Sequence, residues 1–194
     1  MTDTTGYSTL RYSAWLNVRT LQKSKKKCFI KHHFIGCYWN KGILAQKVTP
    51  SYRHESPVFR QNMKKIPPNI FTEVSGDKAF LSRINCRVCE VKGIKPYFKI
   101  RENVRSLAKG NPAWKNMIYE YRNMPEQYNF CYHRRSIAES IISSEKRRLG
   151  HVLFSKKRKT QKIEKRLRTV VYNLLVIVKL RASEILNEPL LLPN

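Results

Sequence analysis

The sequence predicts a single mixed α/β domain. The chain has 194 residues, which is enough for one domain with a sizeable core. Segments rich in Phe, Ile, Val and Tyr dominate its first half, and segments with helical periodicity dominate its second half. The resulting order is strand, hairpin, helix, strand, helix, strand and then helices. That order is typical of a mixed sheet flanked by helices.

The first half of the chain is predicted to begin with a strand followed by a hairpin. Thr, Tyr and Ser in the opening residues suit an extended segment. Residues 39–42 form a turn between two apolar runs, as in a hairpin. Ser56 can cap a helix and Pro57 suits its first turn. The elements expected here are strands at residues 1–8, 28–38 and 43–48 and a helix at residues 56–65.

The rest of the chain, from residue 70 on, is predicted to be mainly helical. Leu81, Ile84, Val88 and Val91 recur at helical spacing, and Gly93 ends that helix. After Gly150 a basic run leads into a long helix, and the last residues are expected to fray. The elements expected here are strands at 70–75 and 96–100, helices at 81–92, 112–122, 132–149 and 160–186, and a tail at 189–194.

The charge of the chain indicates a polyanionic partner. Lys and Arg number 39 against 13 Asp and Glu, a formal net charge of +26. Nucleic acid is the simplest partner for such a charge, and the basic runs at residues 23–27 and 156–159 would contact phosphates. Ribosomal and membrane-surface proteins share this property, so the charge names a class of partner and no activity.

The stretch from Tyr132 to Lys146 carries one polar face if it is a continuous helix. Tyr132, Arg135, Glu139 and Lys146 then fall within an arc of roughly 60°, and the apolar residues lie mostly on the far side. Glu139 is the only acid among these cations, which suits a carboxylate that holds a divalent metal beside a phosphate backbone. The alternative is an ordinary amphipathic helix whose charged face is solvated.

Three acids could converge on one metal site. Asp3 lies on the first predicted strand, Asp77 just past the strand at 70–75, and Glu139 on the helix face. Carboxylates from strand ends and from a packed helix can share two divalent ions ~4 Å apart, which activate a nucleophile and stabilise the leaving oxygen in phosphodiester displacement. The alternative is that Asp3 is a frayed terminal residue and Asp77 the N-cap of the helix expected at 81–92.

The five cysteines are scattered and do not form a disulfide framework, so a reducing cytosol is expected. Cys86 and Cys89 form a lone C-x2-C, whereas a structural zinc needs four ligands. Two half-buried helix cysteines are therefore the favoured interpretation, with zinc as the alternative. No signal peptide is visible, and the apolar run at residues 170–180 is too short to cross a bilayer. We expect a cytoplasmic protein associated with DNA and not with a membrane.

The spacing Tyr132-x2-Arg135-x3-Glu139-x6-Lys146 resembles the signature of the insertion-sequence DDE transposases. Asp3-Thr-Thr-Gly6 is similar to the first acidic motif of that family, and Gly76-Asp77-Lys-Ala-Phe80 is similar to the second. The three motifs follow one another in the family's order, so the resemblance covers nearly the whole chain.

The resemblance implies a ribonuclease-H-like mixed sheet flanked by helices over residues 1–188, with a helical insertion at about 102–130. It implies an enzyme that cuts and transfers DNA during transposition with two Mg²⁺ (or Mn²⁺) ions. The expected partners are transposon ends, target DNA and a second copy in a homodimer on DNA. The residues implied are Asp3, Asp77 and Glu139 for catalysis and metal binding, and Tyr132, Arg135 and Lys146 for DNA contacts.

One departure bears on activity. Only Met1 and Thr2 precede Asp3, whereas members of this family have a further N-terminal region. We therefore expect a truncated first strand, a loosely held Asp3 and a copy impaired in cleavage. The rival hypotheses are a non-enzymatic basic protein that coats DNA and an RNA-binding protein of the ribosomal kind; neither needs metal at the three acids.

Overall fold

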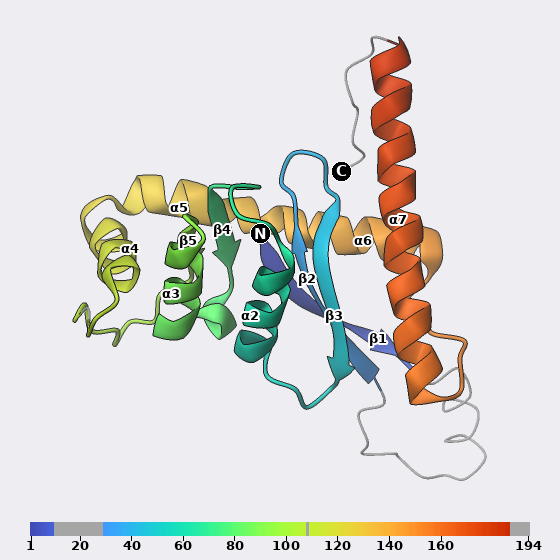
Figure 1. The fold of residues 1–194 in the computed structure, drawn as a ribbon, viewed down its shortest axis with the longest axis horizontal. Coiled ribbons are helices and arrows are strands. Elements are labelled where there is room, and N and C mark those ends of the chain that lie inside the picture. Colours follow the sequence, from blue (N-terminus) through green and yellow to red (C-terminus); the bar gives the residue numbers. More distant parts are fainter. Residues whose placement is uncertain (10–28, 108, 187–194) are drawn as a thin grey trace.

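The structure is a computed structural model that describes residues 1–9, 29–107 and 109–186. It combines a three-stranded antiparallel sheet of order β1-β2-β3 with a two-stranded parallel sheet β4-β5, and helices pack around both (Figure 1). The mixed α/β prediction is thus confirmed. The strands are β1 (Thr2–Ser8), β2 (Phe29–Gly36), β3 (Ile43–Pro50), β4 (Glu73–Gly76) and β5 (Lys95–Phe98).

The helices follow the predicted order, with shifted ends. They are α2 (Glu55–Lys65), η1 (Lys78–Phe80), α3 (Arg83–Val91), α4 (Pro112–Asn123), α5 (Pro125–His133), η2 (Arg134–Ser136), α6 (Ile137–Leu149) and α7 (Arg158–Leu186), where η marks a short 3-10 helix. The predicted basic run at residues 23–27 and the tail at 189–194 lie outside the described residues.

Strand β1 is held along its whole length. It pairs with β2 from Thr2, opposite Ile35, to Ser8, opposite Phe29. Its leading end is fixed too, because the Met1 amino group donates to the Gly36 carbonyl at 3.0 Å and the Gly36 N–H donates to the Met1 carbonyl. The expectation of a loosely held Asp3 is therefore wrong for this structure, since ladder hydrogen bonds flank the residue on both sides.

Strand β4 lies against β1 at Gly76. A Cβ atom at this position would come within 2.8 Å of the Thr2 side chain and 3.1 Å of Phe80. Glycine at this point leaves room for the Thr2 and Phe80 side chains to pack against the backbone of β4. The close approach brings the end of β4, and Asp77 after it, beside the start of β1.

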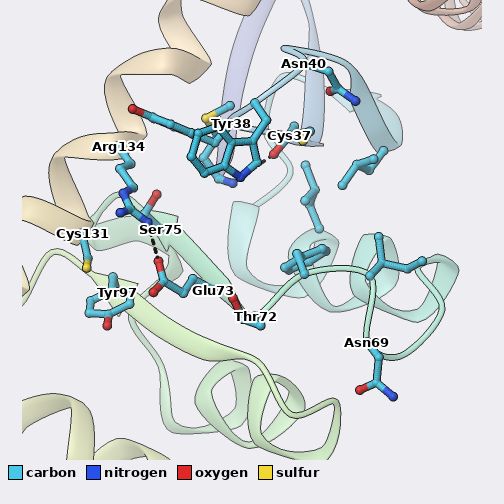
Figure 2. Close-up of a pocket in the computed structure, with 17 residues that line it drawn as sticks. Cys37, Tyr38, Asn40, Asn69, Thr72, Glu73, Ser75, Tyr97, Cys131 and Arg134 are labelled. Atoms are coloured by element: carbon cyan, nitrogen blue, oxygen red, sulfur yellow. Dashed lines mark hydrogen bonds and ion pairs between the residues drawn. The ribbon is translucent and has the colours of Figure 1, made fainter.

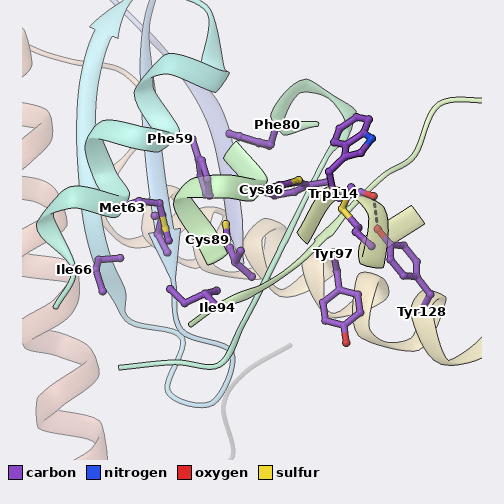
Figure 3. Packing of buried hydrophobic residues seen from close by; sticks show 14 of the residues in the cluster. Phe59, Met63, Ile66, Phe80, Cys86, Cys89, Ile94, Tyr97, Trp114 and Tyr128 are labelled. Atoms are coloured by element: carbon purple, nitrogen blue, oxygen red, sulfur yellow. Dashed lines mark hydrogen bonds between the residues drawn. The ribbon is translucent and has the colours of Figure 1, made fainter. Parts of the chain in front are cut away.

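Helices cover both faces of the first sheet. Ile35 belongs to the large apolar cluster under α2, α3 and α4, and its neighbour Phe34 belongs to a second cluster with Met1 and α6. Because neighbouring residues of a strand point to opposite faces, the two clusters lie on opposite sides of the sheet. Figure 3 shows the first cluster, with Cys86 and Cys89 inside it.

The structure does not support the zinc alternative for the two cysteines. Both are completely buried, not half-buried as expected, and burial raises the pKa of the Cys86 thiol to about 12 and that of Cys89 as well. A zinc ligand must be a thiolate, so this apolar setting opposes metal binding.

The predicted single helix from Tyr132 to Lys146 is wrong in one respect. Helix α5 ends at His133, three residues form the 3-10 turn η2, and α6 begins at Ile137. The chain keeps right-handed helical dihedrals through the turn, with ψ of −15° at Arg134 and −27° at Ser136. A 3-10 turn advances 120° per residue instead of 100°, so it rotates α5 against α6 by roughly 60°.

Helix α7 packs on the rest of the domain through mainly polar side chains. Its side toward the body is largely polar, with Gln161, Lys165, Thr169 and Tyr172 buried. The side-chain amide of Asn173 accepts from the Ile43 N–H at 2.9 Å and donates to the Ile43 carbonyl at 2.8 Å, on the edge strand β3. None of the helices in the described part of the chain is long and apolar enough to cross a membrane.

Candidate active site

The candidate site lies where β1 faces α6. Alternate residues of a strand share one face, so Asp3, Thr5 and Tyr7 point the same way. Lys146 of α6 donates to the Thr5 hydroxyl at 2.7 Å, and Glu145 accepts from the Tyr7 hydroxyl at 2.7 Å. These contacts fix the register of α6 along β1.

Asp3 is the acid whose surroundings most resemble a functional site. Burial raises the pKa of its carboxyl above the usual range, and the negative charges of Glu139 and Asp77 raise it further. The Thr4 N–H, which donates to Asp3 Oδ1 at 2.8 Å, and the Arg135 guanidinium oppose this shift. The three predicted acids are therefore close enough to interact electrostatically through Asp3.

Asp77 has a local structural role. Its Oδ1 accepts from the Lys78 N–H at 2.6 Å, so it caps η1, while Ser82 caps α3. The cap interpretation was right in kind but placed on the wrong helix. A cap uses part of the lone-pair capacity of a carboxylate, so Asp77 can still take part in a metal site.

Glu139 lies in the first turn of α6 and points toward solvent. Its side chain is 69% exposed, and Oε1 is 3.6 Å from a nitrogen of Arg135. Across the described residues, no three His, Cys, Asp or Glu side chains lie close enough together to hold a metal ion. The three acids thus interact without forming a closed metal cluster.

The three residues predicted to contact DNA are placed differently from one another. Arg135 is half-buried beside Glu139 and Asp3. Lys146 is half-buried, and its ammonium lies 5.1 Å from the centre of the Tyr7 ring. Tyr132 packs against the large apolar cluster. The single polar face expected from regular helical spacing is therefore split.

A family model described as the transposase DDE domain matches residues 2–174. The chain belongs to the transposase DDE domain family. The match spans β1 through most of α7 and includes all three acids. No similar curated protein and no similar solved structure was found.

Sequence reasoning missed a buried polar network in this transposase domain. The Lys165 ammonium, fully buried, lies 2.6 Å from Glu145 Oε1 and donates to the Thr169 hydroxyl at 2.8 Å. Glu145 also accepts from Tyr7, so β1, α6 and α7 meet at one carboxylate. The one sequence signal was the acid placed beside Lys146 on an otherwise basic helix end. This network holds α6, and therefore Glu139, against β1.

A pocket of about 590 Å³ lies next to the acids of the transposase domain. Met1 and Ser75 line it, and each is two residues before an acid, Asp3 or Asp77, in the sequence. The Arg134–Glu73 ion pair, 2.9 Å, crosses the pocket, and Figure 2 shows Tyr38 beside Arg134. Sequence reasoning missed this pocket, because its walls come from segments far apart in the chain.

Proposed function

We propose that this chain is the catalytic domain of an insertion-sequence transposase, which cleaves DNA strands and transfers them with Asp3, Asp77 and Glu139. The single observation that carries the proposal is the electrostatic setting of Asp3, whose half-buried carboxyl interacts with the negative charges of both other acids. Such an arrangement is unfavourable in the absence of a cation, and acids shifted by burial and by one another are typical of functional sites. Membership of the transposase family supports it.

We further propose that the two sheets act as one ribonuclease-H-like mixed sheet. The close contact of Gly76 with Thr2 supports this arrangement, because it sets β4 beside β1. The first two acids then come from neighbouring strands, and Glu139 comes from the helix that covers them. The region at about 102–130 would be the helical insertion.

The residues fit a divalent ion in an open site. Carboxylate oxygens are the ligands that Mg²⁺ prefers, and Mg²⁺ keeps several waters or phosphate oxygens, so a closed protein cage is not required. Asp3, Asp77 and Glu139 would hold two Mg²⁺ or Mn²⁺ ions, with Glu139 turning away from Arg135. When bound, such ions activate the attacking oxygen and stabilise the leaving oxygen.

The cations of the domain have separate tasks in this proposal. Arg135 bridges the acids and the DNA backbone, because its guanidinium already lies beside Glu139. Lys146 would contact a phosphate after releasing Thr5. Tyr132 would contribute to DNA binding indirectly, by fixing the position of α5 against the large apolar cluster. Transposon ends and target DNA would lie along the face of β1 and α6.

The test is a nicking assay on supercoiled plasmid with Mg²⁺ or Mn²⁺. We expect the wild-type chain to nick, and Glu139→Gln to reduce the rate by at least about 10³-fold, since a metal ligand is lost while the exposed position keeps the fold. The control is Glu90→Gln, an exposed acid of α3 that is not among the three predicted acids, which should nick like wild type.

Two outcomes of the nicking assay would contradict the proposed function. Equal nicking by Glu139→Gln and wild type would refute the assignment of the acids. DNA binding without nicking, and without any effect of Mg²⁺, would favour the rival hypothesis of a non-enzymatic DNA-binding protein. The open position of Glu139 is the observation behind that rival.

A further inference from the structure

A second pocket of the domain, of about 260 Å³, is lined by three cations and, among the described residues, by no acid. It lies where the first turns of α3 and α4 meet the loop that joins β5 to α4. This pocket is called the Arg83 pocket below. Its lining includes Arg83 of α3, Trp114 of α4, and Arg105, Leu107 and Lys109 of the loop.

Arg83 is held in place while part of its guanidinium stays unused. Its Nη2 donates to the Leu107 carbonyl at 2.9 Å, and its Cζ lies 4.8 Å from the centre of the Trp114 ring, a cation–π contact. Its Nε is buried and has no hydrogen-bond partner among the described residues. An arginine has five N–H donors, so this side chain is oriented by the protein and still has donors to offer a ligand.

The charge of the Arg83 pocket is not balanced by the protein. Within the described ranges, none of Arg83, Arg105 and Lys109 forms a salt bridge. Glu102 is the acid nearest to the loop cations in the sequence, but it is exposed and does not line the pocket. Cations gathered in a concave site reinforce one another in attracting an anion.

A phosphate group is the ligand that this chemistry favours. The planar guanidinium of arginine matches two phosphate oxygens at once, and lysine adds a point charge. Sites for whole small molecules usually have about 300–1,000 Å³, so a pocket of about 260 Å³ suits one phosphate with part of its sugar. Such a group comes either from a nucleic-acid backbone or from free phosphate.

The Arg83 pocket lies at the same edge of the small sheet as Asp77. Strands β4 and β5 are parallel, so their C-terminal ends share one edge. Asp77 directly follows β4, Arg83 opens the next helix, and the loop with Arg105 follows β5. Figure 1 shows α3 and α4 on the side of this sheet away from α7. A strand of DNA that reaches the acids can therefore continue along this edge toward α4.

We propose that the Arg83 pocket binds one backbone phosphate of the DNA strand that is cut at the acids. The inference rests on the proposed function for the identity of the polyanion. Contacts to phosphate carry no sequence information, but they fix the register of the nucleic acid on the protein. The pocket would thus decide which phosphodiester lies at the acids, and its loss should both weaken binding and spread the positions of the nicks.

The first test is the affinity for a labelled duplex, measured by fluorescence anisotropy in EDTA, so that no strand is cut. Arg105→Gln with Lys109→Gln should reduce the slope of log affinity against log salt by about 1, and the affinity by about tenfold at roughly 100 mM salt. The matched control is Lys64→Gln with Arg87→Gln, which removes the same charge from exposed positions outside the pocket and should keep the wild-type slope.

The second test maps the nicks on end-labelled DNA with Mg²⁺. We expect the pocket variant to cut at several neighbouring phosphodiesters where wild type cuts mainly at one. If neither protein nicks DNA, the proposed function fails, whereas the salt slope in EDTA still decides whether the pocket holds a phosphate. If both nick at the same position and bind with the same slope, the pocket proposal fails and the proposed function stands.

Inorganic phosphate, titrated by calorimetry at constant ionic strength, distinguishes the two sources of the ligand. Phosphate that binds wild type but not the pocket variant, together with an unchanged DNA slope, would assign the pocket to a free anion and overturn the DNA contact. An equal loss of slope in the control variant would overturn it too. Circular dichroism checks folding, and Lys109→Gln alone carries the test if the double variant unfolds.

Discussion

At the scale of single residues, Asp3 shows how one carboxylate can oppose the stability of the fold. Its carboxyl is partly buried, and two further acids act on it, while one backbone N–H and one guanidinium compensate. Unlike Asp3, Asp77 stabilises its surroundings by capping η1. The two acids therefore differ in what their replacement does to folding.

Replacing Asp3 by Asn should stabilise the fold. The raised pKa of Asp3 means that the folded state disfavours the charged carboxylate, so the cost is present at neutral and high pH. It vanishes as the pH falls below about 4, where the carboxyl is also protonated in the unfolded chain. We expect Asp3→Asn to raise the melting temperature by about 2–4 °C at pH 8.

The comparison variant is Asp77→Asn, which keeps a capping oxygen and should change the melting temperature by less than about 1 °C. Thermal unfolding of both variants at pH 8 and pH 4 measures the effect. A destabilised Asp3→Asn at pH 8 would show that Arg135 and Thr4 stabilise the carboxylate more than burial disfavours it.

At the scale of elements, strand β2 has a neutral histidine on each face. His33 bonds the Thr4 hydroxyl at 3.0 Å and the Thr49 hydroxyl at 2.8 Å, and so links β1, β2 and β3. His32 is buried between Phe34 and Tyr7. Burial disfavours the charged form of both rings, and this makes the sheet sensitive to acid.

Acid should weaken the sheet between pH 6.5 and pH 4. Burial, helped by Lys31 and Lys47, lowers the pKa of His33 to about 4, and burial lowers that of His32 too. The unfolded chain therefore takes up protons first as the pH falls, and stability is lost through that window. The free energy of unfolding should fall by on the order of 2–3 kcal/mol for His33 alone.

Urea unfolding at pH 7, 5.5 and 4.5 measures this loss. His33→Gln retains hydrogen-bonding groups but has no proton to gain, so its stability should depend less steeply on pH. A variant with the same pH dependence as wild type would assign the acid sensitivity to other groups.

At the scale of the whole molecule, charge and shape are distributed unevenly. The basic run at residues 156–159 is exposed where α7 begins. It lies at the opposite end of this helix from Leu186. The acids, by contrast, are gathered by β1, β4 and α6. Under the proposed function, the exposed cations would hold the DNA while the acids act on it.

DNA binding should be strongly dependent on salt. Between 50 and 200 mM salt the affinity for duplex DNA should fall by at least about tenfold, because each neutralised phosphate releases counterions. Replacing Lys156, Lys157 and Lys159 by Ala should weaken binding and flatten the slope, whereas Lys115→Ala on α4 serves as the comparison. Fluorescence anisotropy measures both, and an affinity unchanged by salt would exclude an electrostatic interface.

Sequence patterns predicted the helices and strands better than the connections and contacts between them. The hairpin of β2 and β3 and the helices α2, α3, α4 and α7 follow from apolar periodicity and from capping residues, both local properties. The 3-10 turn η2 was missed, because Arg134, Arg135 and Ser136 are compatible with either helix type and the Arg134–Glu73 ion pair is a tertiary contact. The pocket and the Glu145–Lys165 pair likewise depend on contacts between distant segments.

The three acids were predicted from motif order, whereas their distances depend on how β4 meets β1 and on how α6 packs on β1. The approach of Glu139 to Arg135 follows from their spacing of four residues on a helix. The largely polar buried side of α7 could not be predicted from the sequence either. Periodicity shows that a helix has two faces, but not which of them packs against the rest of the domain.

The amide of Asn173 has one more consequence. It meets the N–H and the carbonyl of Ile43 as a neighbouring β-strand would. Strand β3 is an edge strand of its sheet. Exposed edge strands can pair with strands of other chains and so start aggregation into fibrils. A single side chain from a helix thus occupies the backbone hydrogen-bonding groups of Ile43, at the end of β3 where the strand of another chain would otherwise begin to pair.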